Sequence, residues 1–316
     1  MYLDLYYNIN YRMMFRMLMM FIMLSSVVAS AKSRDFRPSS SSEKFNQLSF
    51  SGGGSFGAVE IGILKRILET DNKQYDLYTG ISAGALNSGF LSYFSDLKSG
   101  VKAVESIYSR LHNLMIYNVF PPTGVSVLNT DPLFKTLSGI IDNMPNDPVV
   151  NTLIGATNMY SGNLDVFSFE DNDDANKVLL MLSSSAIPGV FPPIKYNGQL
   201  YADGGTLSNE LLQVKGNSGK YINITYITPS QGYSYNDNPI DTLKEMLMRV
   251  FKIVTSNFNN PIVTLNQNCE QPVGEINKYF VSSEYLKDYN SLNFDNGKEL
   301  IDIGYKYAQK QKLKLC

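Results

Sequence analysis

Ser82 stands in the segment Gly80-Ile81-Ser82-Ala83-Gly84, which has the glycine-x-serine-x-glycine spacing of a nucleophile elbow. Such an elbow joins a strand to a helix through a tight turn, and its two glycines keep that turn free of side-chain clashes. The turn also brings the hydroxyl to a helix N-terminus, where the dipole favours developing negative charge. We therefore interpret Ser82 as a nucleophile and Gly80 and Gly84 as its elbow glycines, the alternative being a purely structural turn.

A glycine-rich loop, Gly52-Gly53-Gly54-Ser55-Phe56-Gly57, separates the first expected strand from the first expected helix. Its spacing also satisfies the dinucleotide pattern, but that site needs an acidic residue at the end of the second strand, and Asp76 starts that strand. No Lys-Ser or Lys-Thr follows the glycines, as a phosphate-binding P-loop would require. We favour an oxyanion hole made by the backbone amides of Gly52, Gly53 and Gly54; a nucleotide cradle and a simple tight turn remain alternatives.

The chain has a single histidine, which restricts the residues that could act as the base for Ser82. His112 comes early in the chain and within an expected amphipathic helix, whereas α/β-hydrolases place their histidine last. A carboxylate or a lysine must therefore take the proton, and Lys65 and Lys195 do not lie in segments that form special turns. Asp203, in Asp203-Gly204-Gly205, follows a predicted hairpin, and burial beside a serine would raise the pKa of its carboxyl into a useful range.

Composition excludes several classes of protein. The 316 residues are 44% hydrophobic and 18% charged, which suits a chain with a large core rather than a disordered one. Lys and Arg total 27 against 29 Asp and Glu, so there is no basic excess to bind a nucleic-acid backbone. The two cysteines, Cys269 and Cys316, exclude a disulfide scaffold and a cysteine zinc cluster, and one histidine excludes histidine-based metal sites. We expect neither a metal nor a nucleic-acid partner.

Apolar periodicity predicts strands that alternate with helices, and therefore an α/β fold whose mostly parallel sheet is covered on both faces. Hairpins with antiparallel strands are expected over 152–169 and 193–201, the second with a type I′ turn at Asn197-Gly198. The remaining strands are expected at 48–50, 75–79, 221–228 and 278–282, and helices at 58–69, 83–93, 102–115, 175–184, 241–258 and 296–312. The stretch Met246-Leu247-Met248 would either line an acyl pocket or pack in the core.

Taken together, these motifs resemble the patatin-like phospholipases. The resemblance covers about residues 47–209 and rests on the glycine loop from Ser51 to Gly57, the elbow around Ser82, the segment from Ser183 to Pro193, and Asp203-Gly204-Gly205. It implies a three-layer α/β/α sandwich, a Ser82–Asp203 dyad, an oxyanion hole at Gly52, Gly53 and Gly54, and hydrolysis of acyl esters of phospholipids or neutral lipids without a cofactor. Gly204 and Gly205 would complete the proton-acceptor motif.

One residue departs from the family pattern, because Phe56 stands where the family usually has Arg or Lys. The substitution adjoins the oxyanion loop without removing a backbone donor, so it bears on turnover and on head-group preference. It also motivates an alternative function, that of a weak or inactive lipid-binding protein tethered to a membrane.

The N-terminus has the pattern of a targeting segment. Arg12 and Arg16 precede an uncharged apolar stretch from Met17 to Ala31, which ends in small residues. We expect residues 1–31 to be a cleaved signal peptide or an uncleaved signal-anchor, 32–46 a flexible linker, and 47–316 a single domain. Either form places the protein in the secretory pathway or at a membrane.

Overall fold

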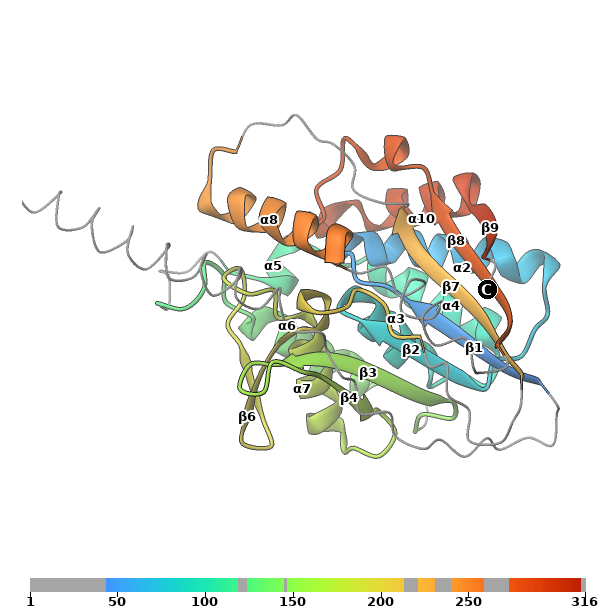
Figure 1. Ribbon diagram of the computed structural model, residues 1–316, viewed down its shortest axis with the longest axis horizontal. Coiled ribbons are helices and arrows are strands. Elements are labelled where there is room, and N and C mark those ends of the chain that lie inside the picture. Colours follow the sequence, from blue (N-terminus) through green and yellow to red (C-terminus); the bar gives the residue numbers. More distant parts are fainter. Residues whose placement is uncertain are drawn as a thin grey trace, which may run out of the picture.

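The computed structural model describes residues 44–118, 124–144, 147–212, 221–230, 240–258 and 273–313 (Figure 1). The expected targeting segment, most of the expected linker and both cysteines lie outside these residues. The first strand begins at Lys44, ahead of the expected start of the domain at position 47.

A single mixed sheet forms the centre of the molecule. Its order is β5-β6-β3-β2-β1-β7-β8-β9, and β4 pairs with β3. The strands are β1 (Lys44–Phe50), β2 (Leu77–Ile81), β3 (Asn151–Asn158), β4 (Leu164–Ser168), β5 (Ile194–Tyr196), β6 (Gln199–Asp203), β7 (Tyr221–Ser230), β8 (Val273–Val281) and β9 (Gln309–Leu313). The central strands β3, β2, β1, β7 and β8 run parallel to one another. Strands β4 and β6 pair antiparallel with β3, and β9 pairs antiparallel with β8.

The helices are α2 (Gly57–Thr70), α3 (Ala83–Leu91), α4 (Leu97–Tyr108), α5 (Asn113–Ile116), α6 (Asp131–Ile141), α7 (Asp174–Ser185), α8 (Leu243–Phe258) and α10 (Gly297–Tyr307). Helices lie on both sides of the mostly parallel sheet, which confirms the predicted α/β sandwich. The main core joins one face of the sheet, including Leu48, Phe50 and Ile154, to the apolar sides of α2, α3, α4, α7 and α10. On the opposite face, Ile81 and Ile224 pack with Leu207 and Leu211.

Both predicted hairpins are present. β3 and β4 pair antiparallel, as do β5 and β6. Asn197 and Gly198 connect β5 to β6 with φ values of 46° and 75°, the left-handed pair that a type I′ turn requires.

The structure corrects two of the predicted helices and adds one that was not predicted. The helix expected over 102–115 is α4, which starts at Leu97 because the Asp96 carboxylate accepts hydrogen bonds from the amides of Lys98 and Ser99. It ends at Tyr108, so His112 is not helical: it is an exposed residue with extended backbone just before α5. Helix α6 was not predicted. The closing helix ends at Tyr307 rather than 312, because the following segment pairs with β8 as the edge strand β9.

Among the described residues, no helix combines the length and the apolar character needed to cross a bilayer.

Candidate active site

Ser82 lies between the end of β2 and the start of α3, with φ 55° and ψ −122°. A left-handed backbone is uncommon for a serine and is maintained here by the surrounding structure. A Cβ added at Gly80 would lie 2.1 Å from the carbonyl oxygen of Gly84, and one at Gly84 would lie 2.5 Å from the carbonyl oxygen of Phe50. Only glycine fits at these two positions, so the turn has the geometry of a nucleophile elbow.

The hydroxyl of Ser82 donates a hydrogen bond of 2.7 Å to Oδ2 of Asp203. Both residues are buried, with Asp203 fully enclosed. The Ser82 amide donates to Oγ of Ser184, which in turn donates to the carbonyl of Gly155 in β3. The structure therefore brings the predicted nucleophile and the predicted base into direct contact.

Strand pairing explains how these two distant residues meet. Gly155 pairs with Ile81 of β2 on one edge of β3 and with Val166 of β4 on the other. The next residue, Ala156, pairs with Asp203 of β6 and Asp165 of β4. Strands β2 and β6 therefore lie end to end along the same edge of β3, so the residue that follows β2 meets the last residue of β6.

Asp203 is held in a fixed orientation. Its Oδ1 accepts a hydrogen bond of 2.7 Å from the amide of Gly205, and its carbonyl accepts one from the hydroxyl of Thr157. Burial raises the pKa of Asp203 to about 7, although the hydrogen bonds from Ser82 and Gly205 oppose the shift. A carboxyl that titrates near neutral pH is suited to take and return a proton. Gly204 is also required sterically, since a Cβ there would lie 2.6 Å from the carbonyl of Gly155.

The glycine loop adjoins the nucleophile, and a Cβ on Gly52 would lie 3.0 Å from the Cβ of Ser82. The prediction that Gly52 supplies an oxyanion-hole donor does not hold in this conformation, because its amide donates to the carbonyl of Asn209 at 3.2 Å. Gly53 and Gly54 differ: their amides have no acceptor among the described residues. Gly54 lines the same pocket as Ser82 and has φ 59°. These two amides are the candidate donors.

Two polar residues that sequence reasoning did not single out support this loop. Asn209 accepts from the Gly52 amide through its carbonyl, and its Nδ2 donates to the Gly52 carbonyl. Glu60 is fully buried in α2, where its carboxyl accepts from the amide and hydroxyl of Ser51 and from Nδ2 of Asn87 in α3. Burial raises the pKa of Glu60 well above its usual value. The sequence signal for Glu60 was its position as the one acidic residue in the otherwise apolar first turn of a predicted helix.

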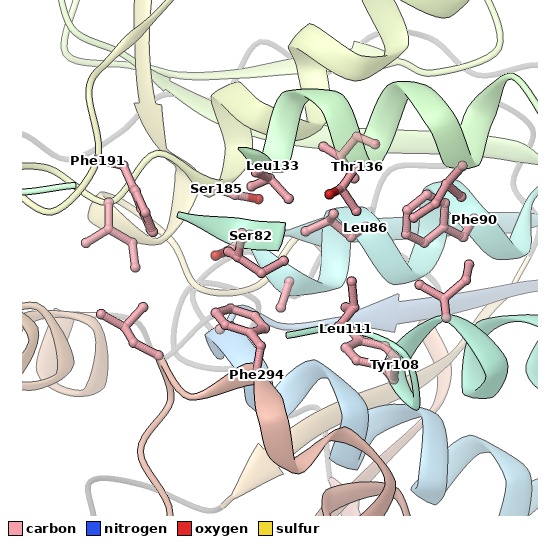
Figure 2. A pocket seen from close by; sticks show the side chains of 18 residues that line it. Ser82, Leu86, Phe90, Tyr108, Leu111, Leu133, Thr136, Ser185, Phe191 and Phe294 are labelled. Carbon is pink, nitrogen blue, oxygen red and sulfur yellow. The ribbon is translucent and has the colours of Figure 1, made fainter. Parts of the chain in front are cut away.

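An apolar pocket extends from Ser82 along α3 (Figure 2). Ser82, Leu86 and Phe90 line it at intervals of four residues, which places them on one side of α3 over about 12 Å. Tyr108, Thr136 and Ser185 also line it, but each hydroxyl already donates a hydrogen bond within the protein. The empty space, including the open mouth, is about 680 Å³.

Helix α8 packs at the Ser82 end of this pocket. Its Phe251, Leu247 and Met248 share a core cluster with the pocket-lining Phe191 and Leu292. Leu247 and Met248 therefore pack next to the pocket without lining it. Near the same place, Nζ of Lys252 lies 5.6 Å from the ring centre of Phe56, so an ammonium group adjoins the glycine loop although position 56 is apolar.

The other candidate bases lie elsewhere. Lys65 pairs with Glu105 at 2.7 Å between α2 and α4, Lys195 is exposed in β5, and His112 is exposed near Asp295. Among the described residues, no group of three or more His, Cys, Asp or Glu side chains is placed to hold a metal ion.

Comparison with known proteins finds a matching family, a viral relative and several solved structures. Residues 48–214, more than half of the chain, match the family described as patatin-like phospholipase. An uncharacterized protein of Acanthamoeba polyphaga mimivirus is 24% identical over 299 residues, covering 87% of this chain and 96% of the relative.

Among solved structures, VipD from Legionella pneumophila aligns with a TM-score of 0.41 at 13% identity, covering 92% of this chain and 73% of VipD. The ExoU–SpcU complex of Pseudomonas aeruginosa aligns with a TM-score of 0.30 at 12% identity, covering 85% of this chain and 53% of the chain it matches.

Proposed function

The chain belongs to the patatin-like phospholipase family, and from this premise we propose that it is a serine esterase that cleaves acyl ester bonds of lipids through a Ser82–Asp203 dyad. The observation that carries the proposal is the buried hydrogen bond of 2.7 Å between Ser82 and Asp203 at one end of an apolar pocket. Members of the family are generally lipolytic hydrolases.

In the acylation step, Oγ of Ser82 attacks the ester carbonyl carbon while Asp203 takes the hydroxyl proton. The amides of Gly53 and Gly54 stabilise the oxyanion of the tetrahedral intermediate. The intermediate collapses, the carbon–oxygen bond of the ester breaks, and the leaving alcohol takes the proton from Asp203. The acyl group stays on Ser82 as an ester.

In the deacylation step, a water molecule attacks the acyl carbonyl carbon and gives its proton to Asp203. The bond to Oγ of Ser82 then breaks, and the serine regains the proton from Asp203. The product is a free fatty acid. One carboxyl thus acts alternately as base and acid, which requires a pKa near the working pH. No cofactor takes part in these steps.

We assign the pocket along α3 to the acyl chain of the substrate. Its lining hydroxyls are satisfied within the protein, so an apolar chain loses no hydrogen bond on entering. The substrates are then membrane phospholipids or other acyl-ester lipids. The location that fits such substrates is the secretory pathway or a membrane, as expected from residues 1–31. N-terminal sequencing of the mature protein tests whether that segment is removed.

Hydrolysis assays with purified variants test the proposal. Ser82→Ala and Asp203→Asn should each lower kcat/KM at least about a thousandfold on a short-chain chromogenic ester and on radiolabelled phospholipid. Ser185→Ala is the matched control, because its hydroxyl lines the pocket but donates to the carbonyl of Met181. Retained activity in either dyad variant would end the dyad mechanism. Lipid binding without any turnover by the unmodified protein would instead favour the lipid-binding alternative.

A further inference from the structure

Helix α8 is apolar on its packed side and along a neighbouring exposed stripe. Its inner side, with Leu247, Met248 and Phe251, packs in the cluster beside the pocket. Its outer side carries Leu243, Met246 and Ile253, whose side chains are 50%, 43% and 41% exposed. Val250 falls on the same stripe, since positions 243, 246, 250 and 253 have the three–four–three spacing of one helix side. The core accounts for the inner side but not for the outer stripe, because the stripe residues belong to none of the core clusters formed by the described residues.

A second exposed apolar group lies beside the start of α8. Nζ of Lys244 lies 5.9 Å from the ring centre of Tyr117, the residue that follows α5. On α5 itself, Leu114 is 79% exposed and Met115 is also exposed. Figure 1 shows α5 next to α8. We call Leu114, Met115, Leu243, Met246 and Ile253 together the apolar ridge. Exposed apolar residues that gather on one part of a protein surface mark an interaction site.

The charge of α8 indicates which partner the ridge fits. Over Leu243–Phe258 the helix has three basic residues, Lys244, Arg249 and Lys252, against a single acid, Glu245, while the whole chain has a net charge of −2. Lys252 is directed at the Phe56 ring inside the protein, whereas helical spacing puts Lys244 and Arg249 on either side of the exposed stripe. The carboxylate of Glu245 turns back to accept hydrogen bonds from the amides of Asp241 and Thr242. A locally basic helix with exposed apolar residues is the pattern that binds the surface of an anionic membrane.

We propose that the apolar ridge, together with Lys244 and Arg249 of α8, docks the protein on an anionic lipid bilayer, with the Ser82 end of the pocket turned toward the lipid. This proposal rests on the proposed function and extends it. Phe191 and Leu292 link α8 to the pocket lining, so docking through α8 places a membrane ester close to Ser82. The acyl chain then enters along α3 without crossing bulk water.

A single-tryptophan reporter tests the docking directly, because the chain contains no tryptophan. The reporter is Met246→Trp, and its matched control is Val149→Trp. Val149 is also exposed, at 55%, but precedes β3 at the opposite end of the sheet from Ser82. Both are made in full-length chain with Ser82→Ala, which prevents hydrolysis during the measurement. The probes are vesicles of phosphatidylcholine alone and of equal parts phosphatidylcholine and phosphatidylglycerol, with and without brominated acyl chains.

With anionic vesicles, emission from Met246→Trp should move to shorter wavelength and be quenched by brominated chains, and high salt should weaken both effects. Emission from Val149→Trp should stay unchanged. The proposal is overturned if both reporters respond alike, if Met246→Trp does not respond, or if it responds equally to neutral vesicles. A concentration-dependent blue shift of Met246→Trp without vesicles would also overturn it, because a second copy of the chain would then cover the ridge.

Activity separates this proposal from the proposed function. Leu243→Ser with Met246→Ser should weaken vesicle partitioning and hydrolysis of vesicle lipid at least about tenfold, because two apolar side chains lose their burial in lipid. Hydrolysis of a soluble short-chain ester should be unchanged. Loss of both activities, or of neither, contradicts docking through α8. If unmodified protein hydrolyses no ester, the proposed function fails while the tryptophan reporters still measure docking.

Discussion

Asp203 determines the pH dependence that the dyad should show. Its pKa is raised to about 7 by burial, and the carboxylate form is the one that accepts the serine proton. We predict that kcat/KM on a soluble ester falls about tenfold per pH unit below the pKa and levels off above it. A pH–rate profile of the unmodified enzyme measures this. An inflection near the usual pKa of aspartate, about 4, or a flat profile would contradict the assigned base.

Asn209 should act as a positioning residue for the oxyanion loop. Asn209→Ala removes the side-chain hydrogen bond to the Gly52 carbonyl, so the neighbouring amides are held less well in place. We predict a loss of about tenfold in kcat with little change in KM, because the donors act mainly on the transition state. Steady-state kinetics and a thermal melt measure the two effects. A lower Tm with unchanged kcat would show that the residue is only structural.

At the residue scale, the sequence predicted the groups that belong to short motifs and missed those that do not. Ser82 and Asp203 stand beside glycines that their tight turns require for steric reasons, and the structure brings the two side chains together. Asn209 is a single polar residue after the last motif, and its role depends on the fold of a loop more than 150 positions earlier. Gly52 carried the right pattern, but its amide is engaged by Asn209, which no local pattern reveals.

The elbow turn depends on the absence of a side chain at its glycines. In Gly84→Ala, the new Cβ would overlap the carbonyl of Phe50, so we predict a loss of about 3 kcal/mol or more in the free energy of unfolding. The control is Gly139→Ala in α6, where nothing lies within 4 Å of the added Cβ. Helix propensity predicts that this control is neutral or stabilising by up to about 1 kcal/mol. Urea unfolding measures the free energy of unfolding of both variants. Equal stability of the two variants would contradict the claim that the elbow turn has no room for a side chain at Gly84.

Phe90 should help to set acyl-chain preference. Figure 2 shows it on the far side of Leu86 from Ser82, and it is buried. Phe90→Leu shortens the side chain, so the ratio of kcat/KM for long-chain over short-chain esters should rise severalfold. Phe45→Leu, in the cluster on the other face of the sheet, is the control and should leave the ratio unchanged. An identical ratio in Phe90→Leu would remove Phe90 from the pocket's determinants.

At the scale of elements, the sequence analysis predicted the central strands and the tight hairpin but missed one helix and one edge strand. The buried central strands and the Asn197-Gly198 hairpin follow from apolar runs and turn chemistry. Helix α6 had a usable signal, since Pro132 lies in its first turn and Leu133, Leu137 and Ile141 form a buried stripe. Strand β9 had none: it is the polar segment Gln309–Leu313, and its pairing with β8 comes from tertiary contact.

The raised pKa of Asp203 also has a consequence for the stability of the whole molecule. A carboxyl whose pKa is higher in the folded state than in the unfolded state destabilises the fold as pH rises from about 4 to about 7. Asp203→Asn removes this cost and can keep both hydrogen bonds, with Gly205 and with Ser82. We predict that the variant is inactive but more stable at neutral pH by up to about 3 kcal/mol.

Denaturant unfolding across that pH range measures the difference. The gain should disappear below about pH 4, where the wild-type carboxyl is protonated in both states. A variant that is less stable at every pH would show that the charge of Asp203 is not the destabilising group.

At the scale of the whole molecule, the meeting of Ser82 with Asp203 does not follow from local patterns. The two residues are 121 positions apart, and their contact depends on β2 and β6 sharing one edge of β3. Apolar periodicity predicted each strand, but the order of strands in a sheet is set by long-range pairing. The expectation that the two side chains meet came from the single histidine, which left a carboxylate as the candidate base, and from the family resemblance.

Labelling by a fluorophosphonate probe tests the central claim most directly, because the probe reacts only with a serine that a neighbouring base activates. Peptide mapping of the labelled, folded protein should find one adduct, on Ser82. Labelling should be absent in Ser82→Ala and greatly slowed in Asp203→Asn. No adduct on well-folded protein, or an adduct on another residue, would contradict the assignment of Ser82 and Asp203 as the catalytic dyad.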